Sequence, residues 1–439
     1  MKRASSAVLI ALLASAAPGH AQAPAGTPAA QTKLTFDGAL RRALEVNTTI
    51  ERAREEIGVA EANRSFLLSA VMPRIGLNGD LTRNSIEQTF GEGPEAIAIL
   101  PQNDWAYRVT LSQPIYAGRR ELRAYSQAKI GIENAREGTR ATEDQTLLRV
   151  SSNYLAVVNA DRRVEVELRN IELAERRLTQ ARAFYEAGEV TKVDVFRAET
   201  AQKAAQRLLA VAEQQREHAV AQLRTDLDID GDITVEAPAR ELPPLPAEGE
   251  LIARATTSRA DIDIAENNVR IAELEVQKQR GFWFPTIRFN GGYIQQRTPF
   301  PANSYAYGGL NFDVPIFQAG EVQARVAGAK SRERQAESSL EEAKLVARED
   351  VRRALADLQS AERGLQLASE QIQAAQAEYE QAFELYRAQE ATSLDVATSE
   401  ASLADARRAV AEETLNLDLA RLRVWYAAGA IKEAVGVTK

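Results

Sequence analysis

The sequence contains no cysteine and only two histidines in 439 residues. Without cysteine, the chain has no disulfide, no thiolate zinc site, no iron–sulfur cluster and no cysteine nucleophile. His20 lies in a predicted signal segment, so His218 is the one imidazole expected in the mature chain. A histidine-ligated metal cluster is therefore excluded, and a serine–histidine triad would depend on His218 alone.

The chain also lacks an excess of positive charge, because 54 Lys+Arg stand against 62 Asp+Glu and give a formal net charge of -8. Nucleic-acid binding requires a clustered basic surplus that neutralises phosphates. No stretch approaches the roughly 18 to 20 apolar residues of a membrane-spanning helix. A nucleic-acid partner and a helical membrane span are therefore not expected.

Residues 1–23 predict an export signal. Two basic residues precede a short apolar run, and Ala21 and Ala23 mark two possible cleavage positions. The Pro/Ala/Gly-rich stretch over residues 24–33 predicts a flexible lead-in. The absence of cysteine after the signal excludes a lipoprotein anchor. The mature chain is therefore expected outside the cytoplasm without a lipid anchor.

The second half of the chain repeats the first. The segment FYEAGEVTKVDV at 184–195 aligns with LYRAQEATSLDV at 385–396, and Pro-Ile-aromatic segments at Pro114 and Pro315 precede them in the same order. These landmarks predict an internal duplication. The predicted boundaries are a first repeat at 34–227, a proline-rich connector at 228–249, a second repeat at 250–430 and a tail at 431–439.

Long segments of each repeat are predicted to be helical. Proline is absent from 117–237 and from 316–439, and Ala, Glu, Arg, Gln and Leu dominate both stretches. Apolar residues follow an alternating three-four spacing typical of a coiled-coil seam, among them Val150, Tyr154, Val157, Leu168, Leu178 and Tyr185. Each long helix is about 100 Å at 1.5 Å per residue. It is predicted to turn back at a tip, at 185–194 and at 386–395, forming antiparallel hairpins.

Each repeat also carries two segments in which apolar and polar residues alternate. The predicted strands are 74–83 and 104–116 in the first repeat, and 286–297 and 304–317 in the second. Strands with one apolar and one polar face are what a transmembrane barrel requires. A small half-buried soluble hairpin would show the same alternation, but it would not require an export signal.

Four strands cannot close a membrane barrel, because known single-chain barrels begin at eight strands and lipid does not tolerate an open edge. The chain is therefore expected to oligomerise. Two copies would give eight strands with a filled interior, whereas three would give twelve strands and leave a lumen. The sequence favours the trimer.

These residues together resemble the TolC-like outer membrane efflux proteins over essentially the whole mature chain. The matching features are the opening segment LTFDGAL at 34–40, the strands that begin at Pro73 and Pro285, and both Tyr-x-x-Gly/Gln-x-x-Thr-x-x-Asp-Val turns. The resemblance implies a mixed α and β membrane protein, a homotrimer that joins a twelve-stranded β-barrel in the outer membrane of a Gram-negative cell to an antiparallel coiled-coil α-barrel in the periplasm. It implies no catalytic residue, cofactor or metal.

The same resemblance implies partners and site residues. The partners are outer membrane lipid, a periplasmic adaptor and an inner-membrane transporter, in multidrug efflux or type I protein secretion. The periplasmic gate would comprise Asp395, Asp194, Tyr386 and Thr392, and the hairpin tips that contact the adaptor would comprise Tyr185, Gly188, Thr191 and Gln389. Gln389 replaces a turn glycine and predicts a different backbone in the second tip. The alternative for both aspartates is that they stabilise a helix N-terminus just after a turn, and this alternative is stronger for Asp194 than for Asp395.

Two other classes of protein are weighed against this interpretation. A periplasmic coiled-coil adaptor or structural protein would explain the helices and the export signal, but not the duplicated strand pairs. A secreted hydrolase would need a converging polar site. His218 instead lies in a helical run, which predicts a solvent-exposed helix residue.

Overall fold

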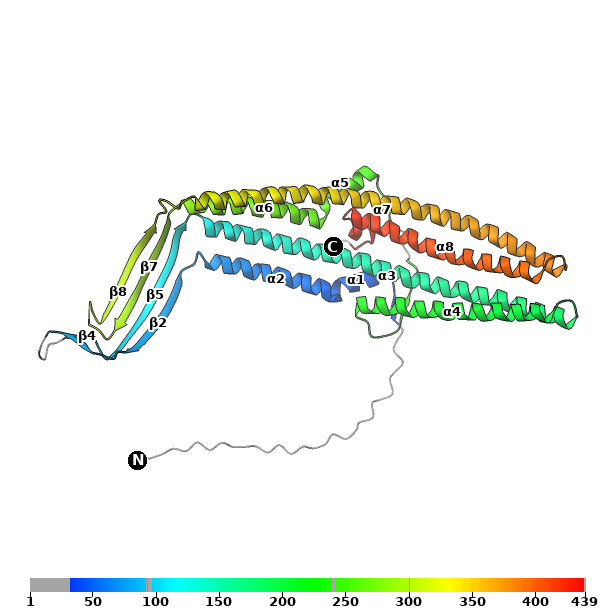
Figure 1. The fold of residues 1–439 in the computed structure, drawn as a ribbon, viewed down its shortest axis with the longest axis horizontal. Coiled ribbons are helices and arrows are strands. Elements are labelled where there is room, and N and C mark those ends of the chain that lie inside the picture. Colours follow the sequence, from blue (N-terminus) through cyan, green and yellow to red (C-terminus); the bar gives the residue numbers. More distant parts are fainter. Residues whose placement is uncertain (1–31, 92, 94–96, 239–241, 300, 438–439) are drawn as a thin grey trace, which may run out of the picture.

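The protein is elongated, with a β-sheet at one end and two long helical hairpins that reach to the other (Figure 1). This computed structural model describes residues 32–91, 93, 97–238, 242–299 and 301–437. The predicted signal at 1–23 and nearly all of the predicted lead-in lie outside the described residues. None of the helices in these ranges is long and apolar enough to cross a membrane.

The sheet has four antiparallel strands in the order β2-β5-β7-β8. They span Arg74–Arg83 (β2), Asn103–Ala117 (β5), Thr286–Gln296 (β7) and Ser304–Asp313 (β8). The predicted strands at 74–83, 104–116 and 286–297 agree with these bounds to within one residue. The strand predicted at 304–317 ends four residues earlier, because Asp313 pairs with the first residue of β7 and the residues after it have no partner strand.

The strand register places apolar residues of all four strands on one face. Directly opposed residues share a face of an antiparallel sheet, and Leu77, Val109, Tyr293 and Ala306 are opposed in turn. The face also carries Ile75, Leu81, Trp105, Tyr107, Leu111, Ile287, Phe289, Leu310 and Phe312. Many of these side chains are exposed, including Leu81 at 80%. The opposite face is mostly polar, although it also carries Ile294 and Tyr305, and Arg108 pairs there with Asp80.

A second, small hairpin lies beyond the outer end of the sheet between β2 and β5. It consists of β3, Gln88–Phe90, and β4, Ile97–Leu100, which pair antiparallel. Sequence analysis did not predict it, because three and four residues are too few to show a period.

The two helical hairpins are closely similar. Helix α3 spans Arg120–Glu186 and α7 spans Glu321–Arg387, with 67 residues in each. The returning helices are α4, Lys192–Leu227, and α8, Ser393–Ala427. These bounds confirm the predicted helices and the predicted turns between them. The tips of both hairpins lie at the end of the molecule farthest from the sheet (Figure 1).

Shorter helices complete the half of the helical region nearer to the sheet. Helix α2, Thr48–Ser69, leads into β2, and α6, Ala260–Arg280, leads through the 3-10 turn η1, Gly281–Trp283, into β7. Each follows a shorter helix, α1 at Phe36–Val46 and α5 at Glu248–Ser258. Both α2 and α6 pack against α3, and α6 also packs against α7.

The largest core cluster lies at the middle of the molecule, where both chain halves meet. Tyr154 is completely buried, and its hydroxyl lies 2.9 Å from the Leu34 carbonyl oxygen and 2.6 Å from that of Glu236. Two short parallel strands pass over it, β1 at Thr32–Leu34 and β6 at Ile233–Val235. The lead-in predicted at 24–33 and the connector predicted at 228–249 therefore contain a strand each, because burial against Tyr154 stabilises three-residue strands that no periodic pattern reveals.

The residues after 430 are also part of this core. Helix α9 spans Ile431–Ala434, and Ile431, Ala434 and Val435 are buried. Residues 431–435 of the predicted tail therefore form a short helix with an apolar, buried side.

The predicted seam of α3 is confirmed in part. Val150, Tyr154, Val157 and Leu178 are buried, whereas Leu168 is 51% exposed and Tyr185 is 45% exposed. The seam residues therefore contact neighbouring helices over two separate stretches of α3.

Candidate functional site

The two hairpin tips have the same backbone conformation. Gly188 has φ 77° and Gln389 has φ 63°, so both lie in the left-handed region. In each tip the next residue donates its N–H to a carbonyl five residues earlier, Glu189 to Phe184 and Glu390 to Leu385, both at 2.8 Å. The prediction that Gln389 gives the second tip a different backbone is therefore wrong. The surrounding turn imposes the left-handed conformation, although a side chain is disfavoured there.

A capping box begins the helix that follows each tip. Thr191 donates its N–H and its hydroxyl to the Asp194 carboxylate, at 3.1 and 2.7 Å. Thr392 does the same to Asp395, at 2.8 and 2.7 Å. These bonds satisfy polar groups that a helix N-terminus leaves without partners. The expectation that both aspartates stabilise a helix start is confirmed, and the structure shows Thr191 and Thr392 as the N-caps.

The same hydrogen bonds keep both carboxylates charged. The hydroxyl of Ser393, followed by that of Thr191, holds the pKa of Asp194 below its ordinary value. The hydroxyl of Thr392 lowers the pKa of Asp395 in the same way. Hydrogen bonds to the ionised form favour it. Each tip therefore presents a negative charge, and Asp395 is the more exposed of the two.

Asp194 also links the two hairpins. The buried Ser393, the first residue of α8, donates its hydroxyl to Asp194 at the start of α4. The backbone carbonyl of Ser393 accepts a 3.0 Å hydrogen bond from Arg177 of α3. The corresponding aspartate, Asp395, has only its own Thr392 as a partner among the described residues. The two tips are thus alike in backbone but not in contacts.

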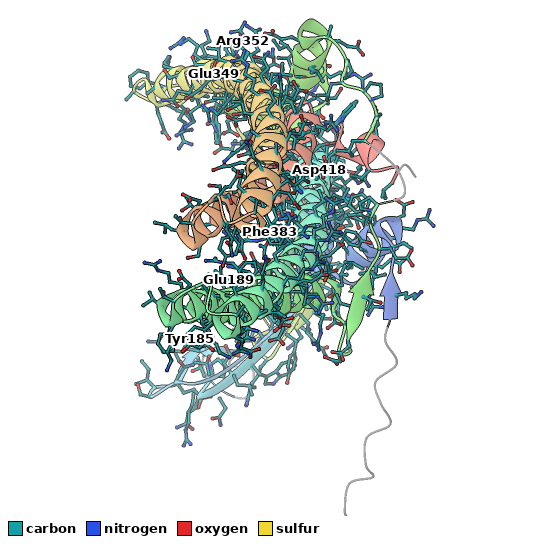
Figure 2. All side chains as sticks on the ribbon, turned by 90° about the vertical axis from the view of Figure 1, so that its right-hand side faces the viewer. Tyr185, Glu189, Glu349, Arg352, Phe383 and Asp418 are labelled. Atoms are coloured by element: carbon teal, nitrogen blue, oxygen red, sulfur yellow. The ribbon has the colours of Figure 1, made fainter. Side chains whose placement is uncertain are left out.

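The two tip tyrosines lie in different environments. Tyr386 is buried, and its ring centroid lies 5.5 Å from that of Phe184 on the neighbouring hairpin. Tyr185 is 45% exposed, and it is visible at the end of the first hairpin beside Glu189 (Figure 2). Gly188, Thr191 and Gln389 are exposed as well. The residues predicted to contact an adaptor therefore lie at the surface, whereas Tyr386 packs inside the protomer.

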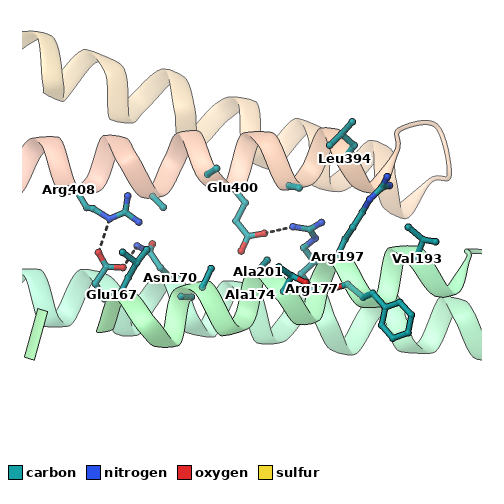
Figure 3. A pocket seen from close by; sticks show the side chains of 18 residues that line it. Glu167, Asn170, Ala174, Arg177, Val193, Arg197, Ala201, Leu394, Glu400 and Arg408 are labelled. Atoms are coloured by element: carbon teal, nitrogen blue, oxygen red, sulfur yellow. Dashed lines mark hydrogen bonds and ion pairs between the residues drawn. The ribbon is translucent and has the colours of Figure 1, made fainter. Parts of the chain in front are cut away.

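A groove of about 590 Å³ runs from the tips between α4 and α8, with α3 as its floor (Figure 3). Its outer end is apolar, because Val193, Phe196 and Leu394 line it and are more than half exposed. Alanines of α4 and α8 form much of its length. The groove therefore offers an apolar surface beside the charged tips.

Two buried ion pairs cross the base of this groove from α3 to α8. Arg177 lies 3.2 Å from Glu400, and Arg408 lies 2.8 Å from Glu167. Figure 3 shows both pairs spanning the space between the helices. Burial raises the pKa of Glu400, against the opposing effect of Arg177. Sequence analysis did not predict these residues. Both helices carry many charged side chains, and nothing in the sequence distinguishes the four that form these pairs from the others.

The described residues contain no group of three or more histidine, cysteine or acidic side chains that could hold a metal ion. His218 is exposed on α4, and its ring nitrogen lies 3.5 Å from the side chain of Gln214 one turn away. The arrangement at the tips therefore provides charge, apolar surface and contacts between helices.

Comparison with known proteins gives consistent matches. The family model of outer membrane efflux proteins matches residues 39–227 and 251–430. Outer membrane efflux protein BepC of Brucella suis biovar 1 is 23% identical over 377 residues, which cover 84% of this chain and 79% of the relative.

Solved structures show the same fold. A CusC structure superposes with a TM-score of 0.78 at 17% identity and covers 90% of this chain and 92% of its own. The open state of the Neisseria gonorrhoeae MtrE outer membrane channel superposes with a TM-score of 0.75 at 20% identity, covering 91% and 90%.

Proposed function

This chain belongs to the outer membrane efflux protein family and is an exit duct of the outer membrane that extends into the periplasm, and we propose that it acts as a homotrimer. The observation that carries the proposal is the open four-stranded sheet with one continuous apolar face. Such a face suits lipid, but the outer edges of β2 and β8 have no partner strand among the described residues. Each unpaired backbone N–H or C=O group in hydrocarbon costs roughly several kcal/mol.

Three copies would remove both edges. If β2 of one copy pairs with β8 of the next, three four-stranded sheets form a closed twelve-stranded barrel. The polar face that carries Arg108 and Asp80 would then line the lumen. An eight-stranded barrel from two copies would be filled by side chains and would not conduct cargo.

Native mass measurement of the detergent-extracted mature protein tests this stoichiometry. We expect a trimer of about three times the mature chain mass, with no stable monomer. A monomer or dimer as the dominant species under conditions that preserve the sheet contradicts the closed twelve-stranded barrel.

We further propose an internal duplication, in which residues 34–227 and 250–430 descend from one ancestral hairpin unit. The equal lengths of α3 and α7 support it, as do the matching capping boxes and the strand pair in each half. The duplication doubles the hairpins per copy, so a trimer forms its periplasmic tube from six.

The hairpin tips are the proposed periplasmic gate. The gate comprises Asp395, Asp194, Tyr386 and Thr392. The hydroxyl of Thr392 donates to the exposed Asp395 carboxylate and lowers its pKa, which keeps it negatively charged. Threefold symmetry repeats each carboxylate around the axis, where three like charges attract cations. Thr398 follows one turn later in place of a second acidic residue, so Asp395 is the acidic residue of the first turn of α8.

Replacing Asp395→Asn tests the gate. The amide oxygen still accepts from Thr392, so we expect trimer formation to be unchanged, while cation preference and block by multivalent cations weaken in planar bilayers. Glu390→Gln is the matched control, because it removes one exposed charge from the same turn. Equal reversal potentials and equal block for wild type and Asp395→Asn would limit Asp395 to capping α8.

The exposed tip residues Tyr185, Gly188, Thr191 and Gln389 are proposed to contact a periplasmic adaptor, which connects the duct to an inner-membrane transporter. The apolar outer end of the groove at Val193, Phe196 and Leu394 supports this placement. We assign the duct to efflux rather than to type I secretion, because the matching family and the Brucella relative are both described as efflux proteins.

A further inference from the structure

A second cavity lies where the sheet meets the helices, about 100 Å from the hairpin tips by the length of α3. It has a volume of about 380 Å³, within the range of small-molecule sites. Arg119, Arg123 and Arg280 line it, together with the aromatic rings of Tyr116 and Phe284. No carboxylate lines it, so the cavity concentrates positive charge in a chain that is acidic overall.

These three arginines differ from the other basic residues of this region. Arg325 pairs with Glu321, Lys278 pairs with Glu275, and Arg120 donates to the Ala117 carbonyl at 2.8 Å. Within the described part of the chain, the side chains of Arg119, Arg123 and Arg280 form no ion pair or hydrogen bond. Their charge is therefore available to a ligand.

The backbone around the cavity leaves no space for a larger side chain. Gly118 has φ 64°, and a Cβ added to it would lie 2.0 Å from the carbonyl oxygen of Gly281. A Cβ on Gly281 would lie 2.6 Å from the Arg120 side chain. Phe282 is stacked between the guanidinium groups of Arg120 and Arg325, at 4.3 and 4.8 Å from its centroid. The cavity therefore lies at a closely packed junction between β5, α3 and α6.

The corresponding junction of the second half carries no such charge. Ala319 and Gly320 before α7 have the same left-handed conformations as Gly118 and Arg119 before α3. The first residue of α7 is Glu321, where α3 begins with Arg120. The turn geometry is therefore common to both halves, but Gly320 and Ala324 stand where the first half has Arg119 and Arg123.

The cavity opens beside the apolar face of the sheet. Tyr116 is paired with Ile287, which belongs to that face, because a bulge after Pro114 shifts the register. Large aromatic side chains near this junction are exposed, with Trp283 at 48%, Phe284 at 51% and Phe317 at 85%. Aromatic side chains of this kind mark the boundary between hydrocarbon and water in membrane proteins.

From this placement we propose that Arg119, Arg123 and Arg280 bind the phosphate of an anionic phospholipid from the periplasmic leaflet of the outer membrane. The guanidinium groups match phosphate oxygens in geometry and charge. The lipid chains would lie along Phe284 and the apolar face above it. The inference rests on the proposed barrel only in its orientation, with the helices on the periplasmic side.

Titration with phosphatidylglycerol in native mass spectrometry tests the site on the detergent-extracted full-length protein. We expect the Arg123→Gln/Arg280→Gln variant to bind this lipid at least tenfold more weakly than wild type, since each basic residue near an anionic surface contributes about fivefold. Arg123→Lys/Arg280→Lys keeps the charge and should retain most of the affinity. Lys330→Gln/Arg332→Gln is the matched control, because it removes two exposed, unpaired charges from α7.

Two further titrations identify the source of the phosphate. Phosphatidylcholine with the same acyl chains should bind more weakly to wild type, and glycerol 3-phosphate should not compete at equal concentration. Equal affinity of wild type and the glutamine variant, an equal loss in the control, or competition by glycerol 3-phosphate would each overturn the proposal. The same spectra report the oligomer, so a failure of the trimer is distinguished from a failure of the lipid site.

Discussion

Gln389 is the residue at which the two hairpin tips differ most in chemistry while agreeing in conformation. Its φ of 63° matches the 77° of Gly188, and both tips form the same 2.8 Å hydrogen bond after the turn. A side chain in the left-handed region costs on the order of 1 kcal/mol relative to glycine. The second tip therefore holds a strained residue that the first tip avoids.

Replacing Gln389→Gly should relieve this strain. We expect the second tip to become more stable against local opening by about 0.5 to 1 kcal/mol, measured by hydrogen exchange at the first turn of α8. The reverse change in the first tip, Gly188→Ala, should destabilise the first turn of α4 by a similar amount. An unchanged exchange rate in both variants would indicate that the turns relax to another conformation.

At the scale of helices, the contact between α3 and α8 holds the two hairpins side by side. Tyr386 packs on Phe184, Ser393 donates to Asp194, and Arg177 pairs with Glu400 in a buried setting. Burial raises the pKa of Glu400 above its ordinary value of 4.5, so desolvation outweighs the attraction of Arg177. We therefore expect the pair to contribute less to net stability than to the register between α3 and α8.

Removing one partner should lower the stability by much more than the intact pair adds to it. We expect Arg177→Met to destabilise the α3–α8 contact by roughly 3 to 5 kcal/mol at neutral pH, because it leaves Glu400 charged and buried. Hydrogen exchange of α8 around Glu400 measures the effect. Arg182→Met is the control, since its pair with Glu199 is exposed and contributes about 1 kcal/mol or less.

The pH dependence of the Arg177→Met variant follows from the same shift. The folded-state pKa of Glu400 is raised, so the folded state binds a proton at a higher pH than the unfolded state does. The free energy of unfolding therefore falls as the pH rises from the unfolded-state pKa of Glu400 to its folded-state pKa. It recovers as the pH falls through the same range. If the destabilisation of Arg177→Met stayed the same at low pH, Glu400 would have another basic group as its partner in the variant.

At the scale of the whole molecule, the sheet and the hairpins divide the work of the duct. In the proposed trimer, the sheet presents its apolar face to lipid and its polar face to the lumen, whereas the hairpins carry charge and apolar surface to the far end. Arg119, Arg123 and Arg280 lie at the boundary between the two parts. In the proposed assembly, side chains of both regions therefore set the position of the membrane along the molecule.

Cysteine labelling tests the two faces without a background, because the native chain has no cysteine. Arg108 and Val109 are neighbours in β5 and point to opposite faces. We expect a water-soluble thiol reagent to label Arg108→Cys much faster than Val109→Cys in membrane vesicles permeable to the reagent. Faster labelling of position 109 would reverse the assignment of lumen and lipid.

The sequence by itself determined the elements of this protein that have a strong period or a specific turn. The helices around the two tips, three of the four sheet strands and both capping aspartates could be predicted to within a few residues. These elements depend on residues that are close in sequence: an unbroken run of helix-forming residues, the alternation of apolar and polar residues in a strand, and a Thr-x-x-Asp cap.

Only the tertiary structure decided which side chains meet across the chain. Strands β1 and β6 exist because they cover Tyr154, and the pair of Arg177 and Glu400 forms because α3 packs on α8. The two tips were expected to differ in backbone, yet they differ in burial, with Tyr386 inside and Tyr185 outside. Such contacts join residues far apart in sequence, and their free energy depends on burial and geometry that no local pattern records.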